Sequence, residues 1–284
     1  MIRFGPAGNS DSFYDEGYKR SEEAPAWLAG RGLTAYEYSF GRGIKLGEDT
    51  ARRIGREAET YGVLVSGHAP YYINLADPEP TKRGKSINYI VETARRVKWM
   101  GGERVVVHVG AQQKRERGEA LAHCAEGLRI AMDTLEAEGL GAVRLCPETM
   151  GKAAQIGNLS ETLGFCKMDE RLIPCIDFAH LHALGHGALN TRTDFARVLD
   201  ETEGMLGQER ARKMHIHFST IEYTEKGERR HRTFAEAAYG PRFEYLASLL
   251  AERDYEPTII CECNGTQAED AAEMMRLFYH CKTV

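Results

Sequence analysis

Two residues that can bind a metal, Asp177 and His180, stand three positions apart at the end of an apolar stretch, Leu172–Ile176. The stretch is short and apolar enough for a strand covered on both faces, with Asp177 at its end and His180 in the loop that follows. Carboxylates and imidazoles are common ligands of divalent metals. For this stretch alone, a helix-capping Asp177 and a surface His180 are an equally good interpretation.

The same layout recurs, because five further apolar stretches also end in a histidine or a carboxylate. Their terminal residues are His68, His108, Glu148, Glu262 and, two positions apart on one face of a strand, His215 and His217. Buried ionisable groups need partners, and shared cations would satisfy all of them together. A set of histidines and carboxylates without cysteine suits Zn²⁺, with Mn²⁺ or Fe²⁺ as alternatives. The set is too large for one tetrahedral ion, so the sequence predicts two or three ions, an arrangement that hydrolyses phosphate esters.

Alternating strands and helices must position these ligands. The predicted strands span residues 1–4, 34–40, 62–68, 104–108, 143–148, 172–177, 213–217 and 258–263. The predicted helices span residues 22–30, 49–59, 81–100, 118–138, 158–166, 193–203, 242–252 and 268–279. This pattern predicts an α/β protein with a (β/α)8 TIM barrel in a single domain, residues 1–284, whose chemistry lies at the carboxyl ends of the strands.

An open doubly wound sheet is the alternative fold. It would usually carry a glycine-rich phosphate loop after the first strand, but residues 5–8 are too short and are broken by Pro6. The barrel is therefore the expected architecture.

Composition is typical of a globular protein, with 42% hydrophobic and 28% charged residues. The net charge of −5 argues against a generally cationic nucleic-acid coat, although it does not exclude a local basic groove. The seven cysteines include no C-x-x-C pair and are expected to be reduced core residues of a cytoplasmic protein. No signal peptide, membrane span or obligate protein partner is indicated.

With these residues in view, the chain resembles the endonuclease IV family of apurinic/apyrimidinic endonucleases, which are xylose-isomerase-like barrels. The matching motifs run in order through almost the whole chain: Gly67–Leu75, Val107–Gly110, Pro147–Gly151, Cys175–His180, Met214–His217 and Cys261–Asn264. The resemblance implies a zinc-dependent enzyme that cuts DNA 5′ of abasic sites in base-excision repair, without a covalent intermediate. DNA containing abasic sites is the partner that it implies.

The resemblance also implies a role for each matched residue. The implied ligands are His68, His108 and Glu148 for the first ion; Glu148, Asp177, His215 and Glu262 for the second; and His180 and His231 for the third. Glu148 would bridge two ions, and Glu148 and Glu262 are the predicted catalytic carboxylates. Tyr71 matches the family residue that enters the DNA near the lesion.

The chain departs from the family between residues 214 and 231. Arg229 stands where the aspartate ligand of the third ion is expected, and Glu228, one position away, is the available replacement. The family reads Asn-Asp after the first histidine of this strand, whereas this chain continues to His217, which leaves open whether His217 is a ligand. Residues 150–152 and the loop Phe40–Gly43 also differ from the family's DNA-reading loops.

A run of basic residues lies beside the predicted site, in what reads as a loop: Lys226, Arg229, Arg230 and Arg232. One interpretation is contact with substrate phosphate, in DNA or in a smaller ester, for which Arg229 and Arg230 are the predicted binding residues. The other interpretation is a solvated surface loop.

Three functions are compatible with these features. The first is a metal-dependent phosphodiesterase of the endonuclease IV type. The second is a metal-dependent sugar isomerase or epimerase of the same barrel superfamily, in which Glu148 and Glu262 would flank the substrate C–H bond. The third is a non-catalytic lesion-binding or nucleic-acid-binding protein with structural metals.

Overall fold

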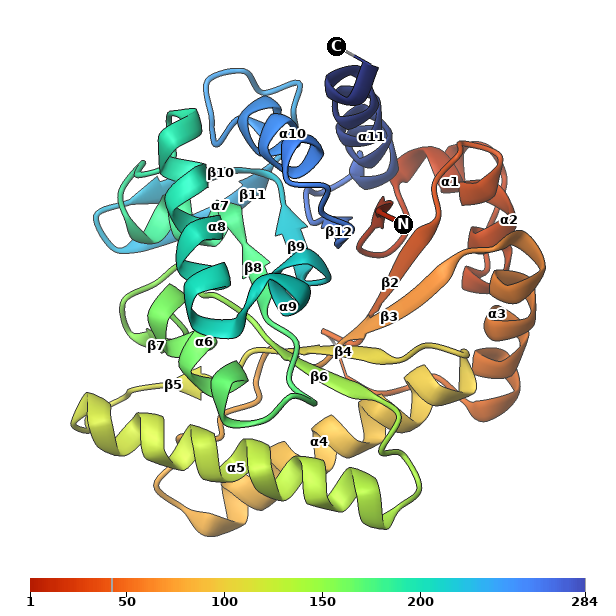
Figure 1. Cartoon of the computed structure of the whole chain (residues 1–284). Helices are drawn as coiled ribbons and strands as arrows, with labels where there is room; N and C mark the ends of the chain where they lie inside the picture. The colour runs from red at the N-terminus through yellow and green to blue at the C-terminus, as the bar shows by residue number, and fades with distance from the viewer. Residues whose placement is uncertain (42, 284) are drawn as a thin grey trace.

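Eight parallel strands form a barrel surrounded by helices in the computed structural model, which describes residues 1–41 and 43–283 (Figure 1). Arg42, in the loop that differs from the DNA-reading loops of the family, lies outside the described residues. The barrel strands are β1 (Arg3–Pro6), β2 (Ala35–Ser39), β3 (Leu64–His68), β4 (Arg104–Val107), β6 (Arg144–Pro147), β8 (Cys175–Asp177), β9 (His215–Phe218) and β12 (Thr258–Cys261). The predicted (β/α)8 fold is confirmed.

The outer helices follow the predicted spans within a few residues. They are α2 (Ala24–Ala29), α3 (Glu48–Tyr61), α4 (Pro80–Trp99), α5 (Arg117–Ala137), α6 (Leu159–Met168), α8 (Arg192–Leu206), α10 (Phe243–Glu252) and α11 (Gln267–Thr283). Helix α6 begins at a capping box, in which Asn158 accepts from the Glu161 amide and Glu161 accepts from the Asn158 amide. Helix α3 buries Ala51, Ile54 and Ala58, which lie on one face at helical spacing.

The strand ladder of the barrel divides into two halves. The first half is β2-β3-β4-β6 and the second half is β8-β9-β12-β1. Single bridges join the halves at two seams: Ala7 with Glu37 at one, and Leu145 with Leu172 and Glu148 with Cys175 at the other. At the first seam a side chain on Gly5 would place its Cβ 1.8 Å from the Ala35 carbonyl oxygen. Glycine is therefore required there for the strands to meet.

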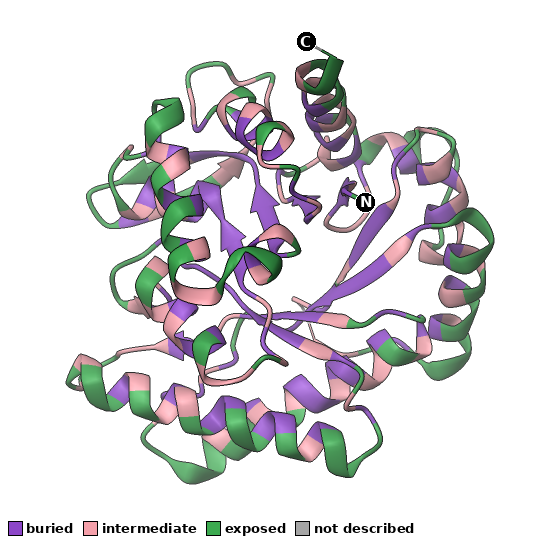
Figure 2. Cartoon of the chain, in the orientation of Figure 1, coloured by how far each residue is buried: buried purple, intermediate pink, exposed green. Residues whose placement is uncertain are grey.

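The strands are buried on both faces, while the helices expose their outer faces (Figure 2). Apolar side chains between the strands and the helices form one large core. A small separate cluster of Val106, Cys146 and Cys175 occupies the barrel interior. Strand residues alternate faces, so the inward positions two residues further on are His108, Glu148 and Asp177. The barrel interior thus has an apolar floor and a polar layer above it.

Several elements differ from the sequence prediction. The strand predicted at Met1–Phe4 lies two residues later, and the one predicted at 172–177 is regular only over Cys175–Asp177. His180 was expected in a loop but lies in helix α7 (Phe178–Leu184), because Asp177 caps this helix. Most of the basic run does not lie in a loop. Arg229, Arg230 and Arg232 belong to strand β11 (Gly227–Arg232) of a hairpin with β10 (Thr220–Thr224), and Lys226 lies in the turn between the two strands.

Four further short elements lie outside the predicted pattern. They are helices α1 (Asp11–Asp15) and α9 (Gln208–Arg212) and the antiparallel pair of β5 (Gly110–Ala111) with β7 (Gln155–Ile156), while a short 3-10 turn, Ser21–Glu23, precedes α2. Among the described residues, no helix is both long and apolar enough to cross a membrane.

Candidate metal centre

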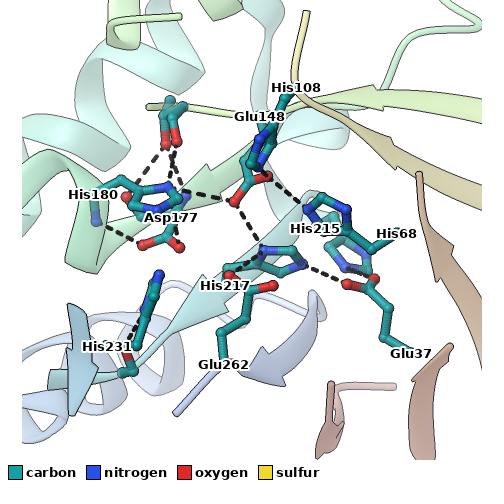
Figure 3. Close-up of polar contacts among 12 residues, drawn as sticks. Glu37, His68, His108, Glu148, Asp177, His180, His215, His217, His231 and Glu262 are labelled. Atoms are coloured by element: carbon teal, nitrogen blue, oxygen red, sulfur yellow. Dashed lines mark hydrogen bonds and ion pairs between the residues drawn. The ribbon is translucent and has the colours of Figure 1, made fainter. Parts of the chain in front are cut away.

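The polar layer of the barrel interior gathers the predicted ligands from both halves (Figure 3). Each of the following residues is no more than 3% exposed: Glu37, His68, Glu148, Asp177, His180, His215 and His217. Charged groups this deeply buried are costly unless each has a partner of opposite charge. Their partners are almost entirely one another.

Glu148, which follows β6, lies at the centre of this layer. Its Oε2 atom is 3.2 Å from Nε2 of His68 and 2.8 Å from Nε2 of His108. Its Oε1 atom is 3.0 Å from Nδ1 of His217. The carboxylate therefore faces the first half of the barrel with one oxygen and the second half with the other.

His68 has its proton position fixed by the backbone. Its Nδ1 lies 2.7 Å from the Ala69 carbonyl oxygen, which can only accept, so Nδ1 carries the hydrogen. Nε2 then faces Glu148 with a lone pair unless a second proton is bound. Burial opposes charging of the ring, but the Glu148 carboxylate raises the pKa of His68 to about 9. A divalent cation between these atoms would take the place of that proton.

His217 and Glu262 complete the contacts of Glu148 on the second half of the barrel. Nδ1 of His217 is 3.3 Å from Oε2 of Glu262 as well as 3.0 Å from Glu148. His215 was the expected ligand here, but the structure places it two residues deeper in β9, where its Nε2 lies 3.1 Å from Oε2 of Glu37. The two histidines share a face, as expected, and His217 is the one that reaches Glu148 and Glu262.

Asp177 both caps a helix and faces the site, so the two readings of this residue are compatible. Its Oδ1 accepts the His180 amide at 2.7 Å, while its buried Oδ2 has no hydrogen-bond partner among the described residues and lies 3.3 Å from Nδ1 of His180. Burial raises the pKa of Asp177 despite the opposing effect of His180 and His231. The free oxygen is available to a cation.

A third group of donors lies between helix α7 and the β10–β11 hairpin. Nδ1 of His180 donates to the Thr149 carbonyl at 2.9 Å, which directs Nε2 toward Oε2 of Glu228 at 3.6 Å. The His231 ring is 5.1 Å from the His180 ring, and donor atoms of Asp177, His180 and His231 lie within 4.8 Å of one another. Asp177 is thus one acidic member of this cluster, and Glu228 adds a second carboxylate beside His180.

Arg229 points away from the donors. Its side chain is 66% exposed and pairs with Glu222 on the neighbouring strand.

The hairpin approaches the site closely because Gly151 and Gly227 lack side chains: a Cβ on Gly151 would lie 2.7 Å from Cβ of Glu228, and one on Gly227 would lie 2.3 Å from the Gly151 carbonyl oxygen. These glycines explain how Glu228 reaches His180.

A cleft of about 550 Å³ opens above the donors. Its lining includes Tyr71, Lys152, Arg230 and Asn264, but not Arg229. Tyr71 is 56% exposed, and its ring centroid lies 5.2 Å from that of His68 and 5.6 Å from that of His108. Of the residues predicted to bind substrate, Tyr71 and Arg230 therefore border the cleft.

Sequence analysis missed Glu37, which is wholly buried in β2 and contacts both His215 and His217. The signal was present, because an acidic residue lies between two tyrosines in the middle of a strand expected to be buried. Cys261 and Cys263 flank Glu262 but contact each other and lie close to Asp270 on α11, so they do not join the donors.

The donor set fits divalent cations. Imidazole nitrogens and carboxylate oxygens make up most of the set, which suits Zn²⁺, Mn²⁺ or Fe²⁺. One thiol, that of the buried Cys175, lies within 4.8 Å of donor atoms of His215 and His217. In the His68 and His180 rings, the second nitrogen donates to a backbone carbonyl, the arrangement that orients metal-binding histidines.

The sequence is similar to those of proteins in both archaea and bacteria. Residues 25–280 match the family described as "Xylose isomerase-like TIM barrel". An uncharacterized protein of Methanocaldococcus jannaschii is 37% identical over 264 residues, which cover 92% of each chain. A probable endonuclease 4 of Acholeplasma laidlawii is 30% identical over 143 residues, 49% of this chain and 48% of that protein. The match to this endonuclease thus spans about half of its length.

Solved structures with the same fold include two kinds of enzyme. A D-tagatose 3-epimerase-like protein superposes with a TM-score of 0.73 at 17% identity, covering 99% of this chain and 98% of the other. Endonuclease IV from Thermus thermophilus superposes with a TM-score of 0.68 at 20% identity, covering 98% of both chains. At these identities the likeness establishes the fold and leaves the reaction to be argued from the site.

Proposed function

The chain belongs to the xylose isomerase-like TIM barrel family, and from that premise we propose that it is a metal-dependent phosphodiesterase of the endonuclease IV type, acting on DNA at abasic sites. The observation that carries this proposal is the third donor group. Glu228 lies 3.6 Å from His180, whose ring neighbours that of His231, in the segment where the chain lacks the expected aspartate. A single-ion isomerase has no need of such a group.

The proposed ligands fall into three overlapping sets. They are His68, His108 and Glu148; Glu148, Asp177, His217 and Glu262; and His180, Glu228 and His231. Divalent ions bound there would act as Lewis acids on a phosphate ester and supply a water of lowered pKa.

The remaining groups of the site would bind and orient the substrate. Lys152 and Arg230 place positive charge on the rim of the cleft, where a phosphodiester would approach. Tyr71 offers an exposed aromatic face beside His68 and His108, suited to stacking on a base or a sugar next to the lesion. A nucleotide that lacks its base costs less to turn out of the duplex, which would favour abasic sites.

The test is cleavage of a duplex oligonucleotide that contains one abasic site, with Zn²⁺- or Mn²⁺-loaded protein. An undamaged duplex and an EDTA-treated sample are the controls. We expect EDTA-sensitive nicking only on the 5′ side of the lesion. Failure of fully metallated protein to nick this duplex would contradict the proposal, and tight binding without turnover would favour a lesion-binding protein.

A sugar isomerase or epimerase is the second candidate. The observation that favours it is the size of the cleft, since about 550 Å³ falls within the range of small-molecule sites. Glu148 and Glu262, which both lie beside Nδ1 of His217, would then be the paired acid and base. Interconversion of free or phosphorylated ketoses and aldoses by the same protein preparation, without nicking, would establish this alternative.

A further inference from the structure

Glu37 reaches across the barrel from the first half to the second. It lies in β2, and in the ladder it pairs with Ser66 of β3, so the two side chains share the inward face. Its contacts on the far side are both in β9: Oε2 is 3.1 Å from Nε2 of His215, and Oε1 is 3.0 Å from Nε2 of His217. Figure 3 shows this carboxylate on the side of His217 away from Glu148.

One oxygen of the carboxylate is hydrogen-bonded on both sides. Ser66 Oγ donates to Oε2 at 2.8 Å, beside the contact from His215. The other oxygen, Oε1, makes no hydrogen bond among the described residues and forms only the ion-pair contact with Nε2 of His217, at 3.0 Å. Glu37 is 0% exposed, so water from the bulk solvent does not compete for these positions.

The position of Glu37 determines which nitrogen of His217 carries the hydrogen. Nε2 lies 3.0 Å from Oε1 of Glu37, while Nδ1 lies 3.0 and 3.3 Å from Glu148 and Glu262, so both ring nitrogens face buried carboxylates. A cation bound between Nδ1 and these two carboxylates would replace the Nδ1 proton, and an unprotonated Nε2 would then set its lone pair against Glu37. With metal bound, Nε2 therefore carries the hydrogen.

From this geometry we propose that Glu37 is a positioning residue of the metal centre. It fixes the ring and the tautomer of His217 so that Nδ1 is the metal ligand. It also contacts His215, which lies deeper in the barrel than His217 and donates a hydrogen bond to Glu37. This inference rests on the proposed metal-dependent function, and it assigns His215 a supporting position. Carboxylate partners of metal-bound histidines act in this way, and their loss typically weakens metal binding about 10–100-fold.

The test compares Glu37→Gln with the wild-type chain, both metallated and without substrate. Gln keeps the size of the side chain but loses the charge and one acceptor. We expect about 10–100-fold weaker Zn²⁺ binding, measured by competition with a chromogenic chelator. We also expect a long-range ¹⁵N–¹H spectrum of the Zn²⁺-loaded protein to show an Nε2-bound proton on His217 that shifts in the variant.

Two further variants keep the test decisive. Ser66→Ala removes one donor to Glu37 and should weaken Zn²⁺ binding by roughly 2–10-fold, the equivalent of one hydrogen bond. This variant provides a test of the inference should Glu37→Gln fail to fold. Glu161→Gln is the matched control, because this carboxylate also accepts several hydrogen bonds, from Arg117 and the amides of Gly157 and Asn158, but contacts no proposed ligand. It should bind Zn²⁺ as the wild type does.

Wild-type affinity in both Glu37→Gln and Ser66→Ala, or an unshifted His217 proton in Glu37→Gln, would overturn the inference. A wild-type chain that binds no divalent ion would overturn it as well. Because neither readout uses DNA, failure of the proposed reaction is distinguishable from failure of this inference.

Discussion

The two halves of the barrel contribute to the site in different ways. The first half supplies Glu37, His68, His108 and Glu148 directly from its strands or the residues that follow them. The second half supplies Asp177, His217 and Glu262 in the same manner, and then adds His180 from α7 and Glu228 and His231 from the hairpin. The second half therefore holds the added donors and the departure from endonuclease IV between residues 214 and 231, whereas the departures at residues 40–43 and 150–152 follow strands of the first half. We infer that the second half determines how many ions bind.

Glu148 joins the two halves, so its substitution should have the largest effect. Glu148→Gln removes the charge shared by His68, His108 and His217. We expect the bound metal to fall by more than one ion per chain, measured by elemental analysis. Activity should fall by more than the roughly 10–100-fold that is typical when a residue contacting a metal ligand, rather than the metal itself, is substituted. Unchanged metal content would remove the bridging role, and Glu161→Gln again serves as the control.

The comparison is sharpened by the two histidines of β9. His217→Ala should lose one ion per chain, because its Nδ1 faces Glu148 and Glu262. His215→Ala should keep the number of ions and bind them about 10–100-fold less tightly, as expected for an outer partner. Equal losses in the two variants, by the same elemental analysis, would return His215 to the ligand set implied by the resemblance.

Gly151→Ala tests whether the hairpin of the second half supplies a separate donor group. The added Cβ would lie 2.7 Å from Cβ of Glu228 and 3.0 Å from the His180 ring, so the hairpin must move. We expect the third ion to be lost while the ions near His68 and His217 remain. Gly84→Ala is the control, since a Cβ there meets nothing within 4 Å. Retention of all ions with an unchanged hairpin would contradict the role of Glu228.

The smallest effect concerns the two arginines of β11. Arg230 borders the cleft, whereas Arg229 pairs with Glu222. We expect Arg230→Ala to weaken DNA binding and to reduce the salt-dependence slope by about 0.9, the value for one phosphate contact, while Arg229→Ala changes neither. Binding measured by fluorescence anisotropy from low to high salt checks this. A larger loss of DNA affinity in Arg229→Ala than in Arg230→Ala would show that the hairpin changes conformation when DNA binds, so that Arg229 faces the DNA.

Most of the barrel was predictable because buried strands and amphipathic helices leave distinct patterns in the sequence. Residues such as His68 and Asp177 were predictable as site residues because polar side chains at the ends of apolar strands are exceptional. The hairpin was not predictable in this way: β11 has a single buried residue and is mostly charged, so its sequence carries no apolar alternation. Helix α7 has only seven residues, too few for a helical period to stand out.

The choice between His215 and His217 shows a further limit. Alternation along a strand assigns both side chains to the inward face, but it does not say how far up the barrel each one lies. That depth depends on how β9 is aligned with β8 and β12, where His217 pairs with Asp177 and Ile260. Glu37 was missed because its partners come from a strand nearly 180 residues away, a distance over which local patterns carry no information.

The seam between β6 and β8 also bears on local opening of the barrel. At this seam the backbone bonds include Ile173 N to Leu145 O at 3.0 Å and Thr149 N to Cys175 O at 3.0 Å, where a full ladder would continue on either side. Glu148 stands on one side of this seam and Asp177 on the other. A cation bound by both residues would hold the two halves of the barrel together at this seam. Amide hydrogen exchange at residues 149 and 173 should therefore slow markedly when metal is added. Amides in the middle of each half, such as Val106 and Ile216, should exchange slowly with or without it.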